Sequence, residues 1–149
     1  VLDFGGHVLR PTAFFSALGA FVDMARRGPL PVFGDGTARS NPIDDRDLAA
    51  VAVRTILDGG PREQDLGGPE VLTRREMAEL AFAALGKPPK IRTMRPWLAS
   101  YARVVLWPIS PRLSQLVGFA AAVSLRDIEA PAVGTRRLGD YLRERAGSR

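Results

Sequence analysis

Short apolar runs and helical spacings of apolar residues alternate along the first third of the chain. Residues 7–9 form a brief apolar run that Arg10 and Pro11 end, which is typical of a buried strand leading into a loop. From residue 14 to residue 27, apolar side chains recur every three or four positions, and Gly28 then stops the pattern. This pattern predicts a strand followed by a helix.

A glycine turn separates the next two extended runs. Residues 31–33 are mostly apolar, Gly34 and Gly36 flank Asp35, and residues 39–43 again have an extended pattern. Because glycine adopts positive φ without strain, these residues predict a hairpin.

Capping residues mark the beginnings of the next two helices. Either Asp44 or Asp45 is expected to cap a helix with an apolar stripe that includes Ile56. Thr73 followed by Glu76 is a capping-box pattern and predicts the start of another helix. Glycine follows each stripe, as expected at a helix C-terminus.

The rest of the chain predicts one more strand and then helices. Residues 90–94 alternate weakly between apolar and polar side chains, as a strand would. From residue 97 onward the spacing is helical with prolines interrupting it, and residues 135–145 predict a last amphipathic helix. Strands that alternate with helices favour an α/β architecture.

The predicted strands are too few and too far apart to complete a sheet, because each parallel strand needs covered neighbours. The chain also begins at Val1 rather than at a methionine, so we expect it to start within a longer protein whose preceding residues complete the sheet. Residues 1–95 would form the last part of the α/β fold with the hairpin, and residues 96–149 a helical C-terminal segment.

Composition argues against several classes of enzyme. The chain of 149 residues has no cysteine and a single histidine, His7, so thiolate metal sites are excluded and a histidine-built metal site or triad has little support. We expect His7 to be a hydrogen-bonded strand histidine. Hydrophobic residues make up 46% of the chain, enough for a sizeable core. No apolar run reaches the roughly 20 residues that span a bilayer, so we expect a soluble, cytoplasmic protein.

Charge is distributed unevenly along the chain. Residues 1–86 carry nine Lys or Arg and twelve Asp or Glu, and residues 87–149 carry twelve and four, which gives net charges of −3 and +8. The basic residues are scattered rather than interleaved with aromatic ones, which argues against nucleic-acid binding. Residues 97–123, with two tryptophans, could touch a membrane, cover a sheet edge or pair two subunits. The sequence does not favour membrane contact, because it shows no continuous apolar face with a basic rim.

Several stretches resemble extended and atypical short-chain dehydrogenases. Residues 8–15 (VLRPTAFF) resemble the late strand and loop of that family, and residues 33–49 (FGDGTARSNPIDDRDLA) resemble the hairpin and helix start that follow. Residues 119–138 are similar to the NmrA-like branch, which includes accessory subunits of respiratory NADH dehydrogenase. The resemblance implies the C-terminal portion of a Rossmann-like fold that binds NAD or NADP, with a small α+β substrate or lid region and terminal helices.

Two features of that family are absent from these residues. Its glycine-rich turn between a strand and a helix holds the pyrophosphate, whereas Gly34 and Gly36 belong to a predicted hairpin turn. Its Tyr-x-x-x-Lys pair is also missing, because neither Tyr101 nor Tyr141 has a lysine four residues later. We therefore predict no catalytic residue and no metal ligand in this chain.

The resemblance points to cofactor and substrate residues near the first strand. It implies that Pro11 and Thr12 lie near the nicotinamide, and ligands of open α/β sheets do bind beyond the carboxyl ends of strands. The alternative is that they only end the strand. Phe14 and Phe15 are candidates for the floor of a substrate pocket, with core packing as the alternative.

Arg39 is the candidate for a substrate phosphate. In nucleotide-sugar epimerases of the extended family, a matching hairpin arginine contacts that group, and a guanidinium suits the task. The alternative is an ion pair with Asp35, Asp44 or Asp45. Asp47 resembles the aspartate that opens the next helix of the family, where we expect a structural role.

Two classes of function follow from these observations. The first is a fragment of an NAD(P)-binding oxidoreductase that contributes the substrate-side wall and lid. The second is a non-catalytic NAD(P)H sensor or accessory subunit, and a nucleotide-sugar epimerase or dehydratase is a narrower third. The expected partners are the missing N-terminal part of the same protein, a small-molecule substrate and possible further copies of the chain.

Overall fold

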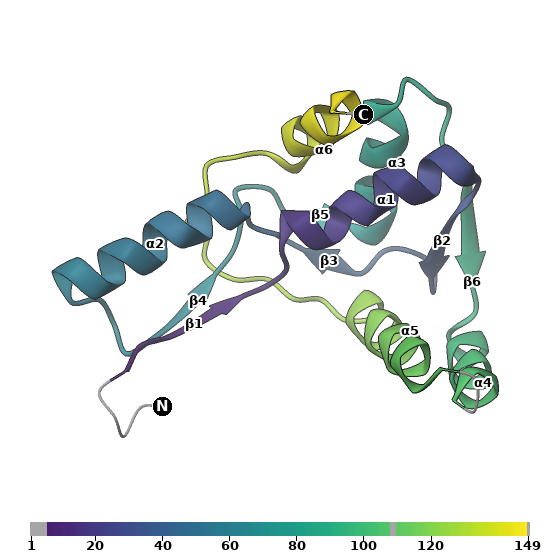
Figure 1. The fold of residues 1–149 in the computed structure, drawn as a ribbon, viewed down its shortest axis with the longest axis horizontal. Coiled ribbons are helices and arrows are strands. Elements are labelled where there is room, and N and C mark those ends of the chain that lie inside the picture. Colours follow the sequence, from purple (N-terminus) through teal and green to yellow (C-terminus); the bar gives the residue numbers. More distant parts are fainter. Residues whose placement is uncertain (1–5, 108–109, 149) are drawn as a thin grey trace.

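The computed structural model describes residues 6–107 and 110–148, and its strands and helices alternate as the sequence predicts (Figure 1). In chain order the elements are β1 (Val8–Pro11), α1 (Phe15–Arg27), β2 (Leu30–Phe33), β3 (Arg39–Ser40), α2 (Asp45–Asp58), β4 (Glu63–Leu66), β5 (Leu72–Thr73), α3 (Arg74–Ala84), β6 (Ile91–Met94), α4 (Pro96–Leu106), α5 (Pro111–Ser124) and α6 (Leu138–Gly147). The α/β class is confirmed.

The described strands form three two-stranded sheets. β1 pairs with β4 in parallel, with Val8 opposite Glu63, and β2 pairs with β6 in parallel, with Leu30 opposite Ile91. β3 and β5 form an antiparallel pair. Each strand of the two parallel pairs therefore has a ladder partner on one edge only among the described strands, whereas parallel strands usually belong to larger sheets.

The predicted hairpin is wrong, because β2 pairs with β6 and β3 with β5. Gly34 and Gly36 do adopt positive φ, 74° and 82°, so the turn itself is as expected. Leu30 and Val32 of β2 are buried, and such a strand needs a covered parallel neighbour rather than an exposed hairpin partner. That neighbour, β6, lies far along the chain and leaves no local signal.

The main hydrophobic core lies between helices α1, α3 and α6 and strand β2 (Figure 1). The Phe15 ring on α1 lies 5.5 Å from the Tyr141 ring on α6, measured between centroids. Each fully buried Phe or Leu stabilises such a core by about 1.5–3 kcal/mol. The buried members are Phe15, Val22, Ala25, Leu30, Val32, Met77, Ala78, Ala81, Phe82, Leu138 and Leu142.

A smaller core joins α2 to the β1–β4 pair. Ile43, Val51 and Leu66 are buried there. Thr55 of the predicted stripe on α2 is also buried and Leu48 packs against this core, whereas Ile56 is 75% exposed, as is Leu57 beside it at 76%. In Figure 1, α2 lies along β1 and β4, away from the main core.

The predicted helix caps are present. The Asp44 carboxylate accepts a hydrogen bond from the N–H of Arg46, 2.7 Å away, at the start of α2. Thr73 and Glu76 form the capping box of α3. The backbone N–H and the hydroxyl of Thr73 both donate to the Glu76 carboxylate. These hydrogen bonds lower the pKa of Glu76, the backbone one more strongly.

Asn41 joins three distant segments of the chain through its buried side-chain amide and its backbone carbonyl, and we call this arrangement the Asn41 clasp. Asn41 is 2% exposed, and its Nδ2 donates to the carbonyl oxygens of Ala130 and Gly68 at 2.7 and 3.2 Å. Its Oδ1 accepts from the N–H of Ala130 at 3.0 Å. Its backbone carbonyl accepts from the Thr12 hydroxyl at 2.6 Å and from the N–H of Gly68 at 2.8 Å.

Glycine is required where these segments cross. A Cβ atom on Gly67 would lie 2.1 Å from Nδ2 of Asn41, and one on Gly68 would lie 1.8 Å from the carbonyl oxygen of Pro42. Real Cβ atoms do not approach so closely, so any larger residue would push the segments apart. The Gly67-Gly68 pair therefore allows the clasp to close.

Substituting Gly68→Ala tests this close approach. We expect the free energy of unfolding to fall by about 3 kcal/mol, because the backbone around Pro42 must move to admit the methyl group. The measurement is urea denaturation followed by circular dichroism. The matched control is Gly28→Ala, where nothing lies within 4 Å of the added atom. Equal midpoints for the two variants would contradict the requirement.

Candidate functional site

Pro11 and Thr12 lie at the carboxyl end of β1, as the sequence predicts. Pro11 is paired with Leu66 of β4, and the N–H of Thr12 donates to the carbonyl oxygen of Leu66 at 3.1 Å. The Thr12 hydroxyl donates its proton to the carbonyl of Asn41. This hydroxyl can therefore only accept a hydrogen bond from a ligand, while its methyl group and the Pro11 ring remain as apolar surface.

The two phenylalanines that follow have different surroundings. Phe14, which precedes α1, is 38% exposed and forms an isolated parallel bridge with Ile43, which precedes α2. Phe15 is 1% exposed and packs within the main core. Of the two, the structure leaves only Phe14 with surface for a ligand, because the first turn of α1 directs Phe15 toward α6.

Arg39 pairs with a residue that the sequence did not suggest. Its Nε lies 3.5 Å from Oε1 of Glu129, and its side chain is 56% exposed. Its backbone N–H donates to the Asp127 carboxylate at 2.7 Å, and its carbonyl accepts from the N–H of Ile128 at 2.9 Å. The expected aspartates bind elsewhere: Asp35 to Thr37, Asp44 to Arg46 and Arg136, and Asp45 to Ser16.

The N-terminus of α1 already holds a carboxylate of the protein. The N–H of Ser16 donates to Oδ2 of Asp45 at 3.1 Å, and the Ser16 hydroxyl donates to Oδ1 at 2.7 Å. The N–H of Phe15 donates to the carbonyl of Ile43 at 3.1 Å. In a strand–turn–helix site a pyrophosphate would bind at the start of the helix that follows β1, where the N–H groups of Phe15 and Ser16 are already bonded to the protein.

The other helices of this region begin in the same way. Asp44 accepts a backbone N–H at the start of α2, and Glu76 does so at the start of α3. A dinucleotide pyrophosphate carries the same sign of charge as these carboxylates and would be repelled by them. These residues therefore do not fit the pyrophosphate of NAD or NADP. Pro11, Thr12 and Phe14 could contact only a cofactor gripped by other residues.

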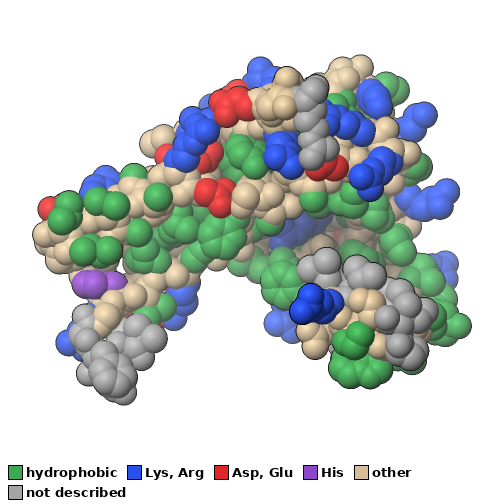
Figure 2. All heavy atoms as spheres, viewed as in Figure 1, with side chains coloured by type: hydrophobic (Ala, Val, Ile, Leu, Met, Phe, Trp, Pro, Cys, Tyr) green, Lys and Arg blue, Asp and Glu red, His purple; other side chains and the backbone are tan. Residues whose placement is uncertain are grey.

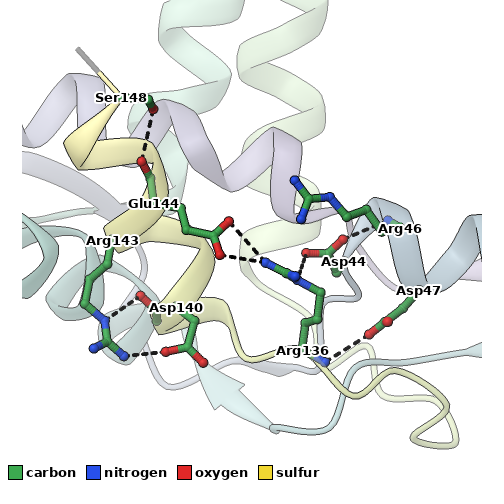
Figure 3. A network of polar contacts seen from close by, with 9 residues as sticks. Asp44, Arg46, Asp47, Arg136, Asp140, Arg143, Glu144 and Ser148 are labelled. Atoms are coloured by element: carbon green, nitrogen blue, oxygen red, sulfur yellow. Dashed lines mark hydrogen bonds and ion pairs between the residues drawn. The ribbon is translucent and has the colours of Figure 1, made fainter.

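An ion network ties the C-terminal segment to the start of α2 (Figure 3). Arg136 donates through Nε to Asp44 at 2.9 Å and through Nη2 to both carboxylate oxygens of Glu144 at 2.9 and 3.1 Å. The hydrogen bond to Glu144 and the charge of that group raise the pKa of Arg136. Asp44, whose side chain is 4% exposed, thus both caps α2 and binds Arg136 of the C-terminal segment.

Asp47 anchors the same segment from the first turn of α2, which agrees with the structural role expected for it. Its Oδ2 accepts from the N–H groups of Thr135 and Arg136 at 2.6 and 3.0 Å. Burial raises the pKa of Asp47, but these hydrogen bonds outweigh it and the pKa lies below its usual value. His7 is exposed, and its Nδ1 lies 3.0 Å from the carbonyl oxygen of Pro61.

A groove of about 530 Å³ lies between α3 and α6, and its lining includes none of the predicted site residues. Arg137 pairs there with Glu70, and Arg143 with Asp140. The groove is lined by Glu70, Leu72, Glu76, Glu79, Leu80, Ala83, Arg137, Gly139, Asp140 and Arg143. In the described part of the chain, no group of His, Cys, Asp and Glu side chains is arranged to hold a metal ion.

Comparisons with known proteins connect the chain to redox enzymes over part of its length. No protein-family model matches it. Over 88 residues it is 43% identical to the divinyl chlorophyllide a 8-vinyl-reductase of Zea mays, a chloroplastic protein, and the match covers 56% of this chain and 22% of that one. Over 66 residues it is 35% identical to NADH dehydrogenase (ubiquinone) 1 alpha subcomplex subunit 9 of Arabidopsis thaliana, a mitochondrial protein, covering 42% and 16%.

One solved structure resembles nearly the whole fold. The UDP-glucuronic acid 4-epimerase of Bacillus cereus, in complex with NAD, superposes with a TM-score of 0.57 at 16% identity, over 91% of this chain and 41% of the epimerase. The chain is therefore homologous over part of its length to a reductase and a dehydrogenase subunit, and its α/β fold resembles part of an NAD-binding epimerase. It matches about a fifth of the reductases' length.

The anchor at Asp47 predicts a loss of stability in acid. Because the folded pKa is lowered, the stabilisation is complete above the unfolded value of 3.8 and disappears as the pH falls through the folded pKa. Asp47→Asn should lower the free energy of unfolding by about 1 kcal/mol at pH 7. Below pH 4 the free energy of unfolding of this variant should decrease less steeply with falling pH than that of the unsubstituted chain. The measurement is urea denaturation between pH 2 and pH 7.

The control is Asp58→Asn, an exposed carboxylate at the other end of the same helix. This variant should keep the acid dependence of the unsubstituted chain. If Asp47→Asn lost stability in acid as steeply as the control, the anchoring role of Asp47 would be wrong.

Proposed function

We propose that this chain is the substrate-facing part of an NAD(P)-dependent oxidoreductase of the short-chain dehydrogenase type, contributing a wall and a lid to its site. The sequence match to a reductase carries the proposal. The likeness to an NAD-complexed epimerase supports it, because it extends over nearly the whole fold. The reductase's own substrate belongs to that protein and is not transferred to this one.

The carboxyl end of β1 supplies the wall. Pro11, the Thr12 methyl group and the half-exposed Phe14 ring form apolar surface there, held in place by the bond from Thr12 to Asn41. Such a surface would bind a planar ring and exclude water from it. The cofactor would supply the hydride, and the residues of this chain would orient it and the substrate.

Residues outside this chain would hold the pyrophosphate. The helix starts at α1, α2 and α3 are already occupied by Asp45, Asp44 and Glu76. The open edges of the β1–β4 and β2–β6 pairs would receive the strands of the N-terminal part of the same protein. On this proposal the cofactor lies between the two parts of one longer chain.

A second candidate is a non-catalytic, cofactor-binding accessory subunit. One relative is by name a subunit of NADH dehydrogenase. The two tyrosines of this chain also lie outside any catalytic pair: Tyr101 is on the exposed side of α4, and Tyr141 packs against Phe15. A tyrosine–lysine pair in the preceding residues would favour the enzyme, and its absence there would favour the subunit.

Arg39 supports a third candidate, a nucleotide-sugar epimerase or dehydratase. Its guanidinium is half exposed and, among the described residues, forms one long ion pair, to Glu129, so a phosphate could displace that carboxylate at little cost. A substrate phosphate at this position would suit the bidentate geometry of arginine. Arg39→Gln would then weaken a nucleotide-sugar ligand and leave a ligand without phosphate unaffected.

Calorimetric titration of the 149-residue chain with NADH and NADPH tests the proposed division of labour. We expect no binding tighter than the millimolar range, because an unassisted apolar wall supplies only a small part of a dinucleotide's binding energy. The longer protein, titrated in parallel, should bind one of the two cofactors in the micromolar range. Micromolar binding to the 149-residue chain would contradict the proposal, as would its absence from the longer protein.

A further inference from the structure

Helices α4 and α5 pack against each other and project from the rest of the fold below β2 and β6 (Figure 1). Large apolar side chains of this pair point outward. Trp97, Tyr101 and Val104 on α4 are 59%, 66% and 72% exposed, and Phe119 on α5 is 68% exposed. Figure 2 shows apolar side chains on the surface of this projecting lobe, at the lower right.

The exposed residues of α4 form one stripe. Trp97, Tyr101 and Val104 are spaced by four and three residues, which places them on the same face of a helix. Trp107, just beyond the end of α4, is also 56% exposed. We call these residues together with Phe119 the α4–α5 surface. Large apolar side chains gathered in this way mark a surface that binds a membrane or another part of a protein.

Within residues 80–126, which carry this surface, every charged residue is basic; Asp35, in a pocket with Arg95, and Asp127, next to Arg126, lie at its margin. No Asp or Glu occurs between Glu79 and Asp127, whereas the same stretch contains Lys87, Lys90, Arg92, Arg95, Arg103, Arg112 and Arg126. Arg112 precedes Phe119 by seven residues and so shares its face of α5. Arg95 lies just before α4, and Arg126 just after α5, and both are exposed. The exposed residues thus supply the apolar face with a basic rim that the sequence pattern did not reveal.

We propose that the α4–α5 surface binds the surface of an anionic lipid membrane. Tryptophan and tyrosine side chains are favoured at the boundary between headgroups and hydrocarbon, and arginines beside them attract anionic headgroups. The helices would lie in the plane of that boundary. None of the helices in the described part of the chain is long and apolar enough to cross a membrane.

Charge and side-chain type decide between a membrane and other occupants. A second copy of the chain, packed symmetrically, would bring the arginines of one α4–α5 surface against those of the other, and they would repel each other. Single-stranded nucleic acid would stack on the aromatic rings but would leave the exposed Val104 and Val105 without an apolar partner. An anionic bilayer complements the arginines, the aromatic rings and the valines together.

The two tryptophans of the chain report directly on this binding, since both belong to the α4–α5 surface. The 149-residue chain is mixed with phosphatidylcholine vesicles that contain about a third phosphatidylglycerol, with some of the phosphatidylcholine brominated on its acyl chains. We expect tryptophan emission to shift to shorter wavelength and to be quenched by the bromine. Vesicles of phosphatidylcholine alone should bind much more weakly, and added salt should release the protein.

Charge variants make the test specific to this surface. Arg95→Gln, Arg112→Gln and Arg126→Gln together should weaken binding to anionic vesicles about a hundredfold, at about fivefold for each arginine near the bilayer. The control removes the same charge elsewhere, with Arg27→Gln, Arg54→Gln and Arg62→Gln. The control should bind within a few fold of the unsubstituted chain. Equal loss in both triple variants would show attraction by net charge alone and overturn the proposal.

Apolar variants complete the test and keep both tryptophans. Tyr101→Ser with Phe119→Ser should abolish bromine quenching, whereas Ile56→Ser with Leu57→Ser, on the exposed side of α2, should not. Both pairs lie at the surface, so neither is expected to prevent folding. The proposal is overturned if tryptophan emission is unchanged by anionic vesicles. It is also overturned if the shift occurs without vesicles and grows with protein concentration, which would indicate a second copy, or if single-stranded DNA alone produces it.

Discussion

The arrangement of this molecule depends on one buried side-chain amide. An amide without partners in a dry interior costs a few kcal/mol, so Asn41 is stable there only if the segments around it stay in place. Its side-chain amide bonds to Gly68 and to Ala130, and its backbone carbonyl accepts from the Thr12 hydroxyl at the end of β1. The clasp therefore reinforces three parts of the chain that backbone hydrogen bonds from Thr12, Gly67 and Val133 also join.

This coupling decides where functional groups can lie. The clasp fixes the carboxyl end of β1. Next to it, Asp44 and Asp47 bind the C-terminal segment at Thr135 and Arg136. Carboxylates that hold the chain together in this way also occupy helix N-termini, where an anionic cofactor would otherwise bind. The same residues that make the region rigid thus prevent it from gripping a pyrophosphate, and what remains for a ligand is the apolar surface beside Thr12.

Local signals in the sequence predicted local structure well. The capping box at Thr73 and Glu76, the cap at Asp44 and the positive φ of Gly34 depend on neighbouring residues, and each is present. Long-range partners could not be predicted. β2 pairs with β6 rather than β3, Arg39 binds Glu129, and the clasp needs Ala130, because sequence spacing says nothing about which distant segments meet. Exposure on α4 was hidden for the same reason, since helical spacing marks an apolar face without showing whether anything covers it.

Amide hydrogen exchange in an Asn41→Ala variant tests the clasp most directly. The informative amides are those of Thr12, Gly67 and Val133, which donate to backbone carbonyls and make no bond to the Asn41 side chain. If the clasp couples the segments, all three should exchange roughly a hundredfold faster in the variant, while amides of α3 keep their rates. Acceleration confined to Ala130, whose N–H donates to Asn41 itself, would contradict this account.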